Sequence, residues 1–389
     1  MRDRRSGGGE PRVLVVLPSL CAEGTPVLTL DLCDRWMALG IEPTIVTLLD
    51  RPNDLAPEFR DHGVAVERMR LPVRGLGRFS SLATATYELC RRLRPQAVLS
   101  MPLGWHSFMF TGARGAGVPR TAAHVGNYPP AGQDPRSLSK FRCLIQIGRP
   151  VTDRLICCSS YIQEGVIHHF GVSRAETEVI YNGVDVEAFS RRAESRATPT
   201  GGLLERGPVT KPFVIGMVAR YEVHKDHPTL IRAAALLRRE GRSIEVWLVG
   251  EGSRRAEYQR LIHDLDLDDT VKLLGVRRDV PELLGQMDVF VFSAKPDEGL
   301  GVALIEAMAA RTPIVATDVG ACREVLLDGQ LGDLVPAADP ATMARALDRY
   351  IAQGSPRDPL RIEQARKRAL TTFSIDEMAI RYARVLDVA

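Results

Sequence analysis

The chain has 389 residues, of which 45% are hydrophobic and 25% are charged. A single hydrophobic core stops growing near ~250 to 300 residues, so we expect two domains, each with its own core. The composition is typical of a folded globular protein, and nothing in it suggests long disordered stretches. No run of ~18 apolar residues occurs, which excludes a transmembrane helix in the sequence.

Seven cysteines, at positions 21, 33, 90, 143, 157, 158 and 322, form no C-x-x-C pair. They also form no His/Cys cluster at zinc-ligand spacing, so the sequence predicts neither a disulfide framework nor a metal site. We therefore expect a reducing, cytoplasmic location. The start MRDRRSGGGEPRVLVVLPSLCA imitates a signal peptide, but its apolar run is short and contains Pro18. We interpret it as a tail followed by a first buried strand.

The net charge of +3 conceals an uneven distribution of basic residues. From Arg68 to Arg154, fourteen Lys or Arg residues accompany only three acids. Such an excess predicts an anionic partner or a lipid headgroup surface, with an ordinary solvated surface as the alternative. We expect an anionic acceptor or an anionic membrane surface at region 68–154, and no nucleic-acid partner.

Short β-branched runs alternate with helical patterns, which predicts parallel sheets with crossover helices. Residues 190–212 contain Pro and Gly without apolar periodicity, and we interpret them as an interdomain linker. The predicted domains are 1–190 and a second domain that starts at 212, with 191–211 between them. The expected strands are 13–17, 44–48, 97–100, 155–159, 213–218, 245–249, 271–274, 289–293 and 314–317.

Ligands of open parallel sheets bind beyond the carboxyl ends of the strands, so two such domains face to face would form one cleft. Neither G-x-G-x-x-G nor G-x-x-x-x-G-K-[ST] occurs, so dinucleotide cofactors and P-loop chemistry have no direct support. Single glycines follow several strands, and each alone is a weak signal because strand-to-helix turns favour Gly. They are Gly24, Gly250, Gly252, Gly299 and Gly301.

The stretch EGLGVALIEAMAARTP, residues 298–313, has a carboxylate near each end of its apolar part. Glu298 and Glu306 would lie ~12 Å apart along a helix axis, on different faces. A glycosidase pair needs carboxyls ~5 to 9.5 Å apart, so this pair is not one. A loop followed by a helix from about Val302 would instead create an anion site at the helix start. An elongated ligand such as a nucleotide sugar would suit it, the alternative being a dipole-paired acid and a buried acid.

Two basic residues, Arg220 and Lys225, lie in ARYEVHKDHPTLIRA, just after a predicted strand. Basic residues in a loop are usually solvated. At the carboxyl end of a strand, however, they would neutralise a diphosphate.

Four stretches together resemble the family 4 retaining glycosyltransferases of the GT-B fold, over nearly the whole chain. The resemblance implies an α/β fold of two doubly wound Rossmann-like domains that face each other across a cleft. It also implies that 1–190 is the acceptor side, that 212–372 binds the nucleotide sugar, and that 373–389 is a helix crossing back to the first domain. The stretches are ARYEVHKDHPTLIRA, VWLVGEGSRRAEYQRLI, VKLLGVRRDVPELLGQMDVFVFSAKPDEGLGVALIEAMAARTPIVATDVGACREVL and VIYNGVDVEAF.

The resemblance also implies roles for single residues. Glu298 would meet hydroxyls of the transferred sugar, and Glu306 the ribose hydroxyls. Arg220 and Lys225 would clamp the diphosphate and stabilise it as a leaving group. His124, in RTAAHVGN, would face the donor sugar. The remaining donor-binding positions are Gly24, Val276, Arg277, Gly299, Leu300 and Gly301.

The chain departs from the family pattern at three places. The stretch CAEGTPVLTL retains only Gly24 of a usual Gly-Gly pair. Asp226 stands where Gly is commoner, and Arg311 replaces a usual Gly. The acidic run DLDLDD, residues 264–269, contains a D-x-D spacing but precedes a predicted strand, so we interpret it as a solvated helix-to-strand turn. We expect no metal and no cofactor, since the nucleotide sugar is a substrate.

The sequence thus predicts a hexosyltransferase that moves a sugar from a nucleotide-diphosphate donor to a glycan, lipid-linked or other anionic acceptor. The resemblance implies retention of configuration, in cell-surface polysaccharide or glycoconjugate synthesis, with Glu298 as a positioning and electrostatic group. Two alternatives stay open, a nucleotide-sugar epimerase on the same scaffold and a noncatalytic partner in glycan assembly. The expected location is cytoplasmic, with peripheral contact at the inner face of the membrane.

Overall fold

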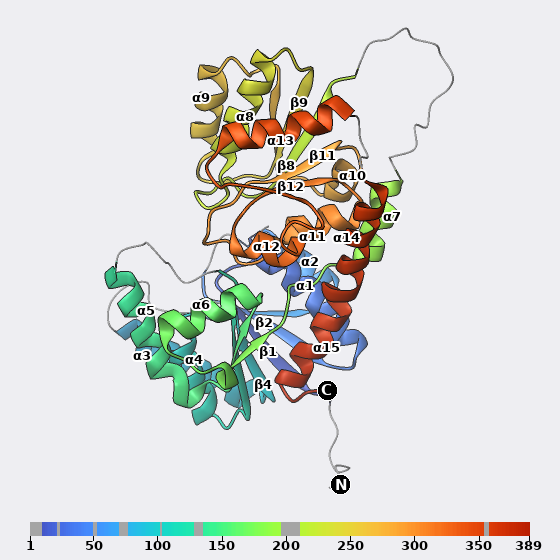
Figure 1. The fold of residues 1–389 in the computed structure, drawn as a ribbon. Coiled ribbons are helices and arrows are strands. Elements are labelled where there is room, and N and C mark those ends of the chain that lie inside the picture. Colours follow the sequence, from blue (N-terminus) through green and yellow to red (C-terminus); the bar gives the residue numbers. More distant parts are fainter. Residues whose placement is uncertain are drawn as a thin grey trace. The chain divides into compact units, whose positions relative to one another are not determined.

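The computed structural model describes residues 10–21, 24–49, 53–69, 77–101, 103–127, 135–195, 211–353 and 358–389. The chain divides into two compact units, one of Met1–Gly183 with Ile375–Ala389 and one of Val184–Ser374. Each unit contains a parallel sheet flanked by helices (Figure 1). The predicted α/β fold class is confirmed.

The first unit has a seven-stranded sheet. Its strands are β1 (Arg12–Leu17), β2 (Glu42–Thr47), β3 (Ala65–Arg68), β4 (Ala97–Ser100), β5 (Arg120–Val125), β6 (Arg154–Cys157) and β7 (Thr177–Val179). The strand order is β3-β2-β1-β4-β5-β6-β7, and all neighbours are parallel. Its helices are α1 (Gly24–Ala38), α2 (Ala56–Asp61), α3 (Gly77–Leu93), α4 (His106–Gly115), α5 (Pro135–Gly148), α6 (Ser160–Phe170) and α15 (Ile375–Val385), with 3-10 turns η1 (Arg149–Val151) and η2 (Arg174–Glu176).

The second unit has a six-stranded sheet. Its strands are β8 (Phe213–Val218), β9 (Ile244–Val249), β10 (Val271–Gly275), β11 (Val289–Phe292), β12 (Ile314–Thr317) and β13 (Asp333–Val335). They follow the order β10-β9-β8-β11-β12-β13, again with parallel neighbours. Its helices are α7 (Val186–Glu194), α8 (His227–Arg239), α9 (Arg255–Asp264), α10 (Val280–Leu284), α11 (Val302–Ala309), α12 (Gly320–Leu326), α13 (Pro340–Gln353) and α14 (Pro359–Thr372).

All nine strands predicted from the sequence are present, with ends shifted by at most two residues. Four further strands were missed. β3, β7 and β13 are short edge strands that are only partly buried, so they lack the apolar run that marks a central strand. β5 is buried but reads RTAAHV, in which small residues replace most of the expected β-branched side chains.

Helix α7 occupies the start of the segment interpreted as a linker. The second unit begins at Val184, whereas the sequence placed 1–190 in the first domain. α7 packs against α10, α11 and α14, and the Ser190 hydroxyl donates to the Ala309 carbonyl at 2.8 Å. The helix was not predicted because the arginines and glutamates of α7 obscure, in the sequence, the buried residues that recur along it at helical spacing. Residues 196–210 of the expected linker lie outside the described residues.

Helix α15 returns to the first unit and joins its core. Its side chains belong to the same apolar cluster as those of α1 and β1. The Trp36 indole N–H donates to the Ala379 carbonyl at 3.0 Å, and Arg35 pairs with Asp376 at 2.7 Å. The end of the chain therefore stabilises the first unit. None of the helices in the described ranges is long and apolar enough to cross a membrane.

Three buried histidines predict how stability depends on pH. Burial lowers the pKa of His106, His124 and His227 to about 4 each. The unfolded chain binds a proton at each of them below about pH 6.5, whereas the folded protein does so only near pH 4. The free energy of unfolding should therefore fall between pH 6.5 and pH 4, by about 1.4 kcal/mol per pH unit for each histidine.

Urea unfolding at several pH values measures this slope. His106→Asn should make it shallower by the contribution of one proton, because that site no longer titrates. The same substitution at His263, whose side chain is exposed, serves as the control for the exchange of His for Asn itself. A slope for His106→Asn equal to that of the parent protein would contradict the interpretation.

Candidate functional site

The candidate site lies at the switch point of the sheet in the second unit. β8 pairs with β9 on one side and with β11 on the other, and later strands are added outward in both directions. Ligands of open α/β sheets bind beyond the carboxyl ends of the strands at such a point. Two loops leave the sheet here, 219–226 after β8 and 293–301 after β11. They carry Arg220, Lys225 and Glu298.

The Lys225 ammonium donates a hydrogen bond to the Glu298 carboxylate. Their side chains are 15% and 8% exposed, so the pair is largely removed from solvent. The Lys225 Nζ atom also lies 4.9 Å from the centroid of the Phe292 ring. The ammonium is thus held by a carboxylate and by an aromatic face. Sequence reasoning named both charged residues, but it missed Phe292.

Glu298 is held in its ionised form. Burial alone would raise the pKa of its carboxyl, but the Lys225 ammonium keeps that pKa below its ordinary value. The backbone N–H of Gly299 adds to this effect. An ionised carboxylate accepts hydrogen bonds and donates none, so Glu298 is suited to bind hydroxyl groups.

The loop that carries Lys225 is fixed from several sides. The Lys295 N–H donates to the His224 carbonyl at 2.9 Å, which joins the two loops of the site. The His227 ring bonds the Lys225 carbonyl through Nδ1 and lies edge to face with Tyr221 at 5.1 Å. The Lys225 backbone is therefore positioned before any ligand binds.

Two of the glycines noted in the sequence permit a close backbone crossing. Gly250, with φ +142°, lies where an added Cβ atom would be 2.1 Å from the Ala219 carbonyl oxygen. At Gly252 an added Cβ would be 2.6 Å from the Tyr221 carbonyl oxygen. These glycines let the loop after β8 cross the end of β9.

Helix α11 begins at Val302, where the sequence predicted it. Gly301 precedes it with φ +79°, and an added Cβ there would meet the Phe292 ring at 3.0 Å. Leu300 is buried in the loop before the helix, and Glu306 is half-buried on α11 itself. The two acids of the motif therefore belong to different elements, one to a loop and one to a helix.

The other predicted positions belong to other elements of the two units. Val276 and Arg277 follow β10 and are exposed, and Arg277 pairs with Asp279 at 2.6 Å. Gly24 begins α1 in the first unit, with no atom within 4 Å of an added Cβ. His124, near the end of β5, is 3% exposed, and its Nδ1 atom lies 2.8 Å from the Tyr382 hydroxyl.

Two of the departures from the family pattern, Asp226 and Arg311, have side-chain partners in the second unit. Asp226 is buried and accepts a hydrogen bond from the Thr229 hydroxyl at 2.6 Å. Arg311 has φ +57°, a conformation that favours Gly, and its guanidinium pairs with Glu194 and with Glu363 at 2.5 Å.

The acidic run 264–269 begins at the last residue of α9 and continues through the turn before β10, at the predicted helix-to-strand turn. Across the part of the chain that the structure describes, no group of three or more His, Cys, Asp or Glu residues could hold a metal ion.

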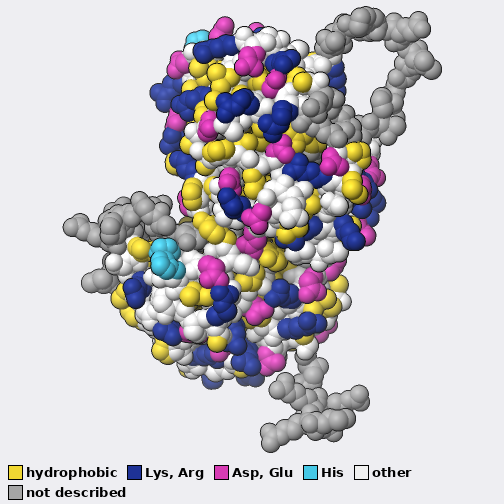
Figure 2. Space-filling model, viewed as in Figure 1, with side chains coloured by type: hydrophobic (Ala, Val, Ile, Leu, Met, Phe, Trp, Pro, Cys, Tyr) yellow, Lys and Arg dark blue, Asp and Glu magenta, His cyan; other side chains and the backbone are white. Residues whose placement is uncertain are grey.

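The basic region 68–154 is partly neutralised within the first unit. Several of its arginines form ion pairs with acids, and basic and acidic side chains are mixed over the face in view in Figure 2. The pairs are Arg92–Glu67 (3.1 Å), Arg114–Asp153 (2.5 Å), Arg120–Asp387 (3.5 Å) and Arg149–Glu176 (2.7 Å). The basic excess in the sequence therefore overstates the charge available to a partner.

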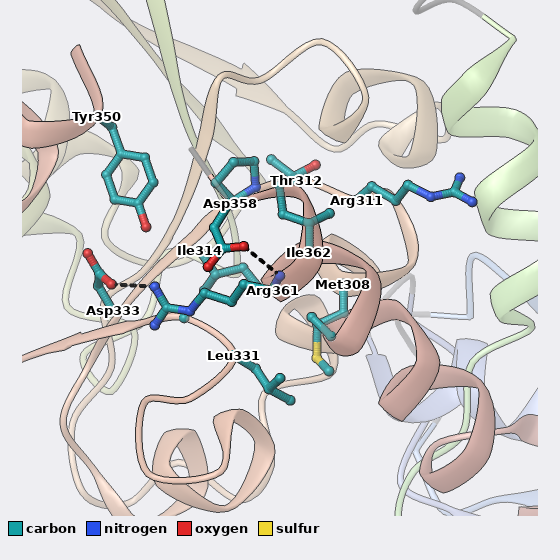
Figure 3. Close-up of a pocket in the computed structure, with 13 residues that line it drawn as sticks. Met308, Arg311, Thr312, Ile314, Leu331, Asp333, Tyr350, Asp358, Arg361 and Ile362 are labelled. Carbon is teal, nitrogen blue, oxygen red and sulfur yellow. Dashed lines mark hydrogen bonds and ion pairs between the residues drawn. The ribbon is translucent and has the colours of Figure 1, made fainter. Parts of the chain in front are cut away.

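A separate pocket, with about 80 Å³ of space, lies in the second unit (Figure 3). Ile314 and Asp333 line it at the amino ends of β12 and β13, opposite the edge that carries Lys225. The Arg361 guanidinium bonds Asp333 at 2.7 Å, and its backbone N–H donates to Asp358 at 2.9 Å. We assign no ligand to this pocket, because the charged side chains that line it already have ion-pair or hydrogen-bond partners in the second unit.

Two family models cover most of the chain. The model for glycosyl transferases group 1 matches residues 205–368, and the model for glycosyltransferase family 4 matches residues 22–188. The lipopolysaccharide core biosynthesis glycosyltransferase LpsE of Rhizobium meliloti (strain 1021) is 30% identical over 277 residues, which cover 70% of this chain and 74% of LpsE. The chain belongs to the group 1, family 4 glycosyltransferases, as the resemblance predicted.

Other relatives match over a shorter part of their length. The chain is 30% identical to EpsD of Bacillus subtilis (strain 168) and covers 61% of the length of that protein. It spans 63% of a Campylobacter jejuni N-acetylgalactosaminyltransferase whose name specifies a diphospho-undecaprenol acceptor, at 27% identity. Among solved structures, Anabaena Alr3699/HepE in complex with UDP and glucose superposes with a TM-score of 0.80 at 19% identity, covering 96% of this chain and 99% of that one. This likeness supports the GT-B fold.

Proposed function

We propose that this chain transfers a hexose from a nucleotide-diphosphate sugar to a hydroxyl of a glycan, lipid-linked or other anionic acceptor. The proposal includes retention of configuration and a role in cell-surface polysaccharide or glycoconjugate synthesis. The observation that carries it is the buried Lys225–Glu298 pair at the switch point of the second unit. Family membership supports it, as do the lipid-linked acceptor named for the Campylobacter relative and the UDP and glucose bound to Alr3699/HepE.

The pair has the chemistry that a nucleotide sugar requires. The Lys225 ammonium, with Arg220 from the same loop, would neutralise the diphosphate as it leaves the sugar. The ionised Glu298 would accept hydrogen bonds from sugar hydroxyls, and Glu306 from the ribose. The diphosphate would help to deprotonate the acceptor hydroxyl on the same face of the sugar. The proposal includes no metal, because Lys225 and Arg220 supply the positive charge.

Donor binding tests this assignment most simply. A ligand that binds only the folded state raises the melting temperature, so a thermal-shift screen across nucleotide sugars should identify the donor. Lys225→Met should abolish the shift, because the diphosphate loses a fixed charge. The donor should then be incubated without an acceptor, since conversion to an epimer would identify an epimerase instead. A parent protein that is shifted by no nucleotide sugar or nucleoside diphosphate would contradict the proposal.

Phe292 offers a prediction about how Lys225 is held. Phe292→Leu keeps the position apolar but removes the aromatic face beneath the ammonium. We expect the Kd for the nucleoside diphosphate to rise roughly five- to tenfold, which corresponds to about 1 kcal/mol of cation–π attraction. Isothermal titration calorimetry measures the change.

The matched control for Phe292 is Phe290→Leu, on the same strand and equally buried. The two rings stack on each other at 6.4 Å, so both substitutions disturb the same part of the core. Phe290→Leu should reduce stability without weakening nucleotide binding. Equal losses of affinity in both variants would contradict a specific role for Phe292.

We further propose that region 68–154 contacts an anionic acceptor or the anionic inner face of the membrane from the cytoplasm. The basic excess in the sequence supports this, although several arginines are paired within the first unit. Sedimentation with anionic vesicles at two salt concentrations tests it, because electrostatic binding must weaken as salt increases. Absence of vesicle binding at low salt would contradict the membrane contact and leave the anionic acceptor as the partner.

A further inference from the structure

The inference concerns the side chain of His227, in the second unit, which directly follows the loop that carries Lys225. His227 is the first residue of α8 and is 0% exposed. Its backbone N–H donates to the Lys225 carbonyl at 2.5 Å, and its ring Nδ1 atom bonds the same oxygen. The Lys225 carbonyl oxygen therefore has two hydrogen-bond partners from a single buried residue.

Lys225 is held at both of its backbone polar groups. Its backbone N–H donates to the Glu222 carbonyl at 3.0 Å, and its carbonyl accepts from His227. At the other end of the side chain, the ammonium donates to the Glu298 carboxylate. Because the side chain extends from this fixed backbone, the place of the ammonium depends on the hydrogen bonds to His227.

His227 belongs to a cluster of three buried rings, which it forms with Tyr221 and Tyr258 and which we call the ring cluster. The ring centroids of His227 lie 5.1 Å from those of Tyr221 and 4.9 Å from those of Tyr258. The two tyrosine rings are 5.5 Å apart, and the Tyr221 hydroxyl donates to the Leu248 carbonyl at 2.8 Å. Packing on two aromatic rings fixes the orientation of the imidazole, so that Nδ1 faces the Lys225 carbonyl.

The partners of the His227 ring determine which nitrogen carries its proton. Burial lowers the pKa of His227 to about 4, so the ring is neutral at pH 7 and has one proton. A carbonyl oxygen can only accept, so the Nδ1 atom that bonds Lys225 must donate, and Nε2 then has no proton. The Ala219 carbonyl is another backbone acceptor near the ring, but among the described residues Nε2 has no hydrogen-bond partner.

We propose that His227 is a positioning residue for the donor diphosphate, because its Nδ1–H tautomer fixes the Lys225 backbone and thereby places the Lys225 ammonium before the donor binds. The proposal rests on the proposed function, which supplies the diphosphate. His227 is fully buried and acts through Lys225, without touching the ligand itself. The ring cluster then contributes to donor affinity as well as to the packing of the second unit.

The tautomer can be measured without any ligand. Long-range proton–nitrogen NMR spectra of the full chain labelled with ¹⁵N-histidine distinguish the two tautomers, and the signal of His227 is the one lost in His227→Asn. Free histidine in water favours the proton on Nε2, so a proton on Nδ1 marks the bond to Lys225. We expect a protonated Nδ1 and an unprotonated Nε2 at pH 7. A proton on Nε2 would overturn the proposal, whether or not the protein proves to be a transferase.

Two substitutions of His227 test whether the Nδ1 bond supports donor affinity. Asn carries its amide nitrogen near the place of Nδ1 and can still donate to Lys225, whereas Gln carries its amide nitrogen near the place of Nε2 and cannot. In calorimetric titrations with UDP, dTDP, GDP and ADP, His227→Gln should raise the Kd of the tightest binder roughly tenfold, and His227→Asn by less than about threefold. Equal rises in both variants would overturn the proposal. A parent protein that binds none of the four would count against the proposed function instead, and the NMR result would still decide the tautomer.

Tyr221→Phe provides the matched control. It keeps all three rings of the ring cluster but removes the hydrogen bond to the Leu248 carbonyl, and it leaves the bond between His227 and Lys225 in place. We expect a lower Tm, with the Kd for the same nucleoside diphosphate changed by less than about twofold. If Tyr221→Phe raises the Kd as much as His227→Gln does, loosening of the ring cluster explains both, and the proposal is wrong.

Discussion

Glu298→Gln should lower kcat/KM for the nucleotide sugar by about a thousandfold. The substitution keeps the shape of the side chain but removes the charge that holds the Lys225 ammonium. Preorganised electrostatic contacts of this kind are worth about 10²- to 10³-fold each, and Glu298 also orients the sugar. Initial rates of nucleoside diphosphate release measure the effect. A value within threefold of the parent would exclude Glu298 from the site.

Asp297→Asn is the control, because it removes the neighbouring carboxylate of the same loop. Its effect on kcat/KM should stay within a few fold. Removal of one partner of a buried ion pair costs roughly 3 kcal/mol of stability or more, so circular dichroism must show that Glu298→Gln is folded at the assay temperature. Combining Glu298→Gln with Lys225→Met should cost little beyond Glu298→Gln alone, since the two residues act as a unit.

Gly250→Ala should destabilise the second unit by about 4 kcal/mol or more, or prevent its folding. The added Cβ atom would lie 2.1 Å from the Ala219 carbonyl oxygen, which is backbone and cannot move aside cheaply. The φ of +142° adds strain for any residue with a side chain. Urea unfolding followed by tryptophan fluorescence measures the change. The loop that carries Lys225 starts at this crossing, so donor binding should be lost with stability.

Gly241→Ala separates the cost of the backbone conformation from the cost of the clash with the Ala219 carbonyl. Gly241 also has a positive φ, +77°, but no atom lies within 4 Å of an added Cβ. The backbone conformation alone should cost about 1 to 2 kcal/mol. If both variants lose the same stability, the clash with Ala219 is not the reason that Gly250 is glycine.

The sequence predicted the elements that carry a strong local signal. Buried central strands such as β8 and β11 show apolar β-branched runs, and the start of α11 at Val302 follows from the glycines before it. Short edge strands carry no such run, and α7 was obscured by its charged residues. These elements form because neighbouring elements bury them, and a local sequence pattern does not indicate such burial.

Contacts between residues far apart in the chain could not be predicted from the sequence. Lys225 and Glu298 were named separately, but their pairing depends on β8 and β11 being neighbours in the sheet. Phe292 carried no signal of its own, because an aromatic residue in a buried strand normally indicates core packing. The bond between His124 and Tyr382 joins residues 258 positions apart and arises only because α15 returns to the first unit.

The most direct test of the proposed transfer is proton NMR of the purified chain with a panel of nucleotide-diphosphate sugars, with a lipid-linked glycan acceptor and without one. We predict that one donor is converted to nucleoside diphosphate faster with acceptor than without it. We also predict that the sugar appears in the product with the anomeric configuration of the donor, and that Glu298→Gln abolishes the reaction. Conversion of no nucleotide sugar under any of these conditions would contradict the proposed function, and inverted product would contradict retention.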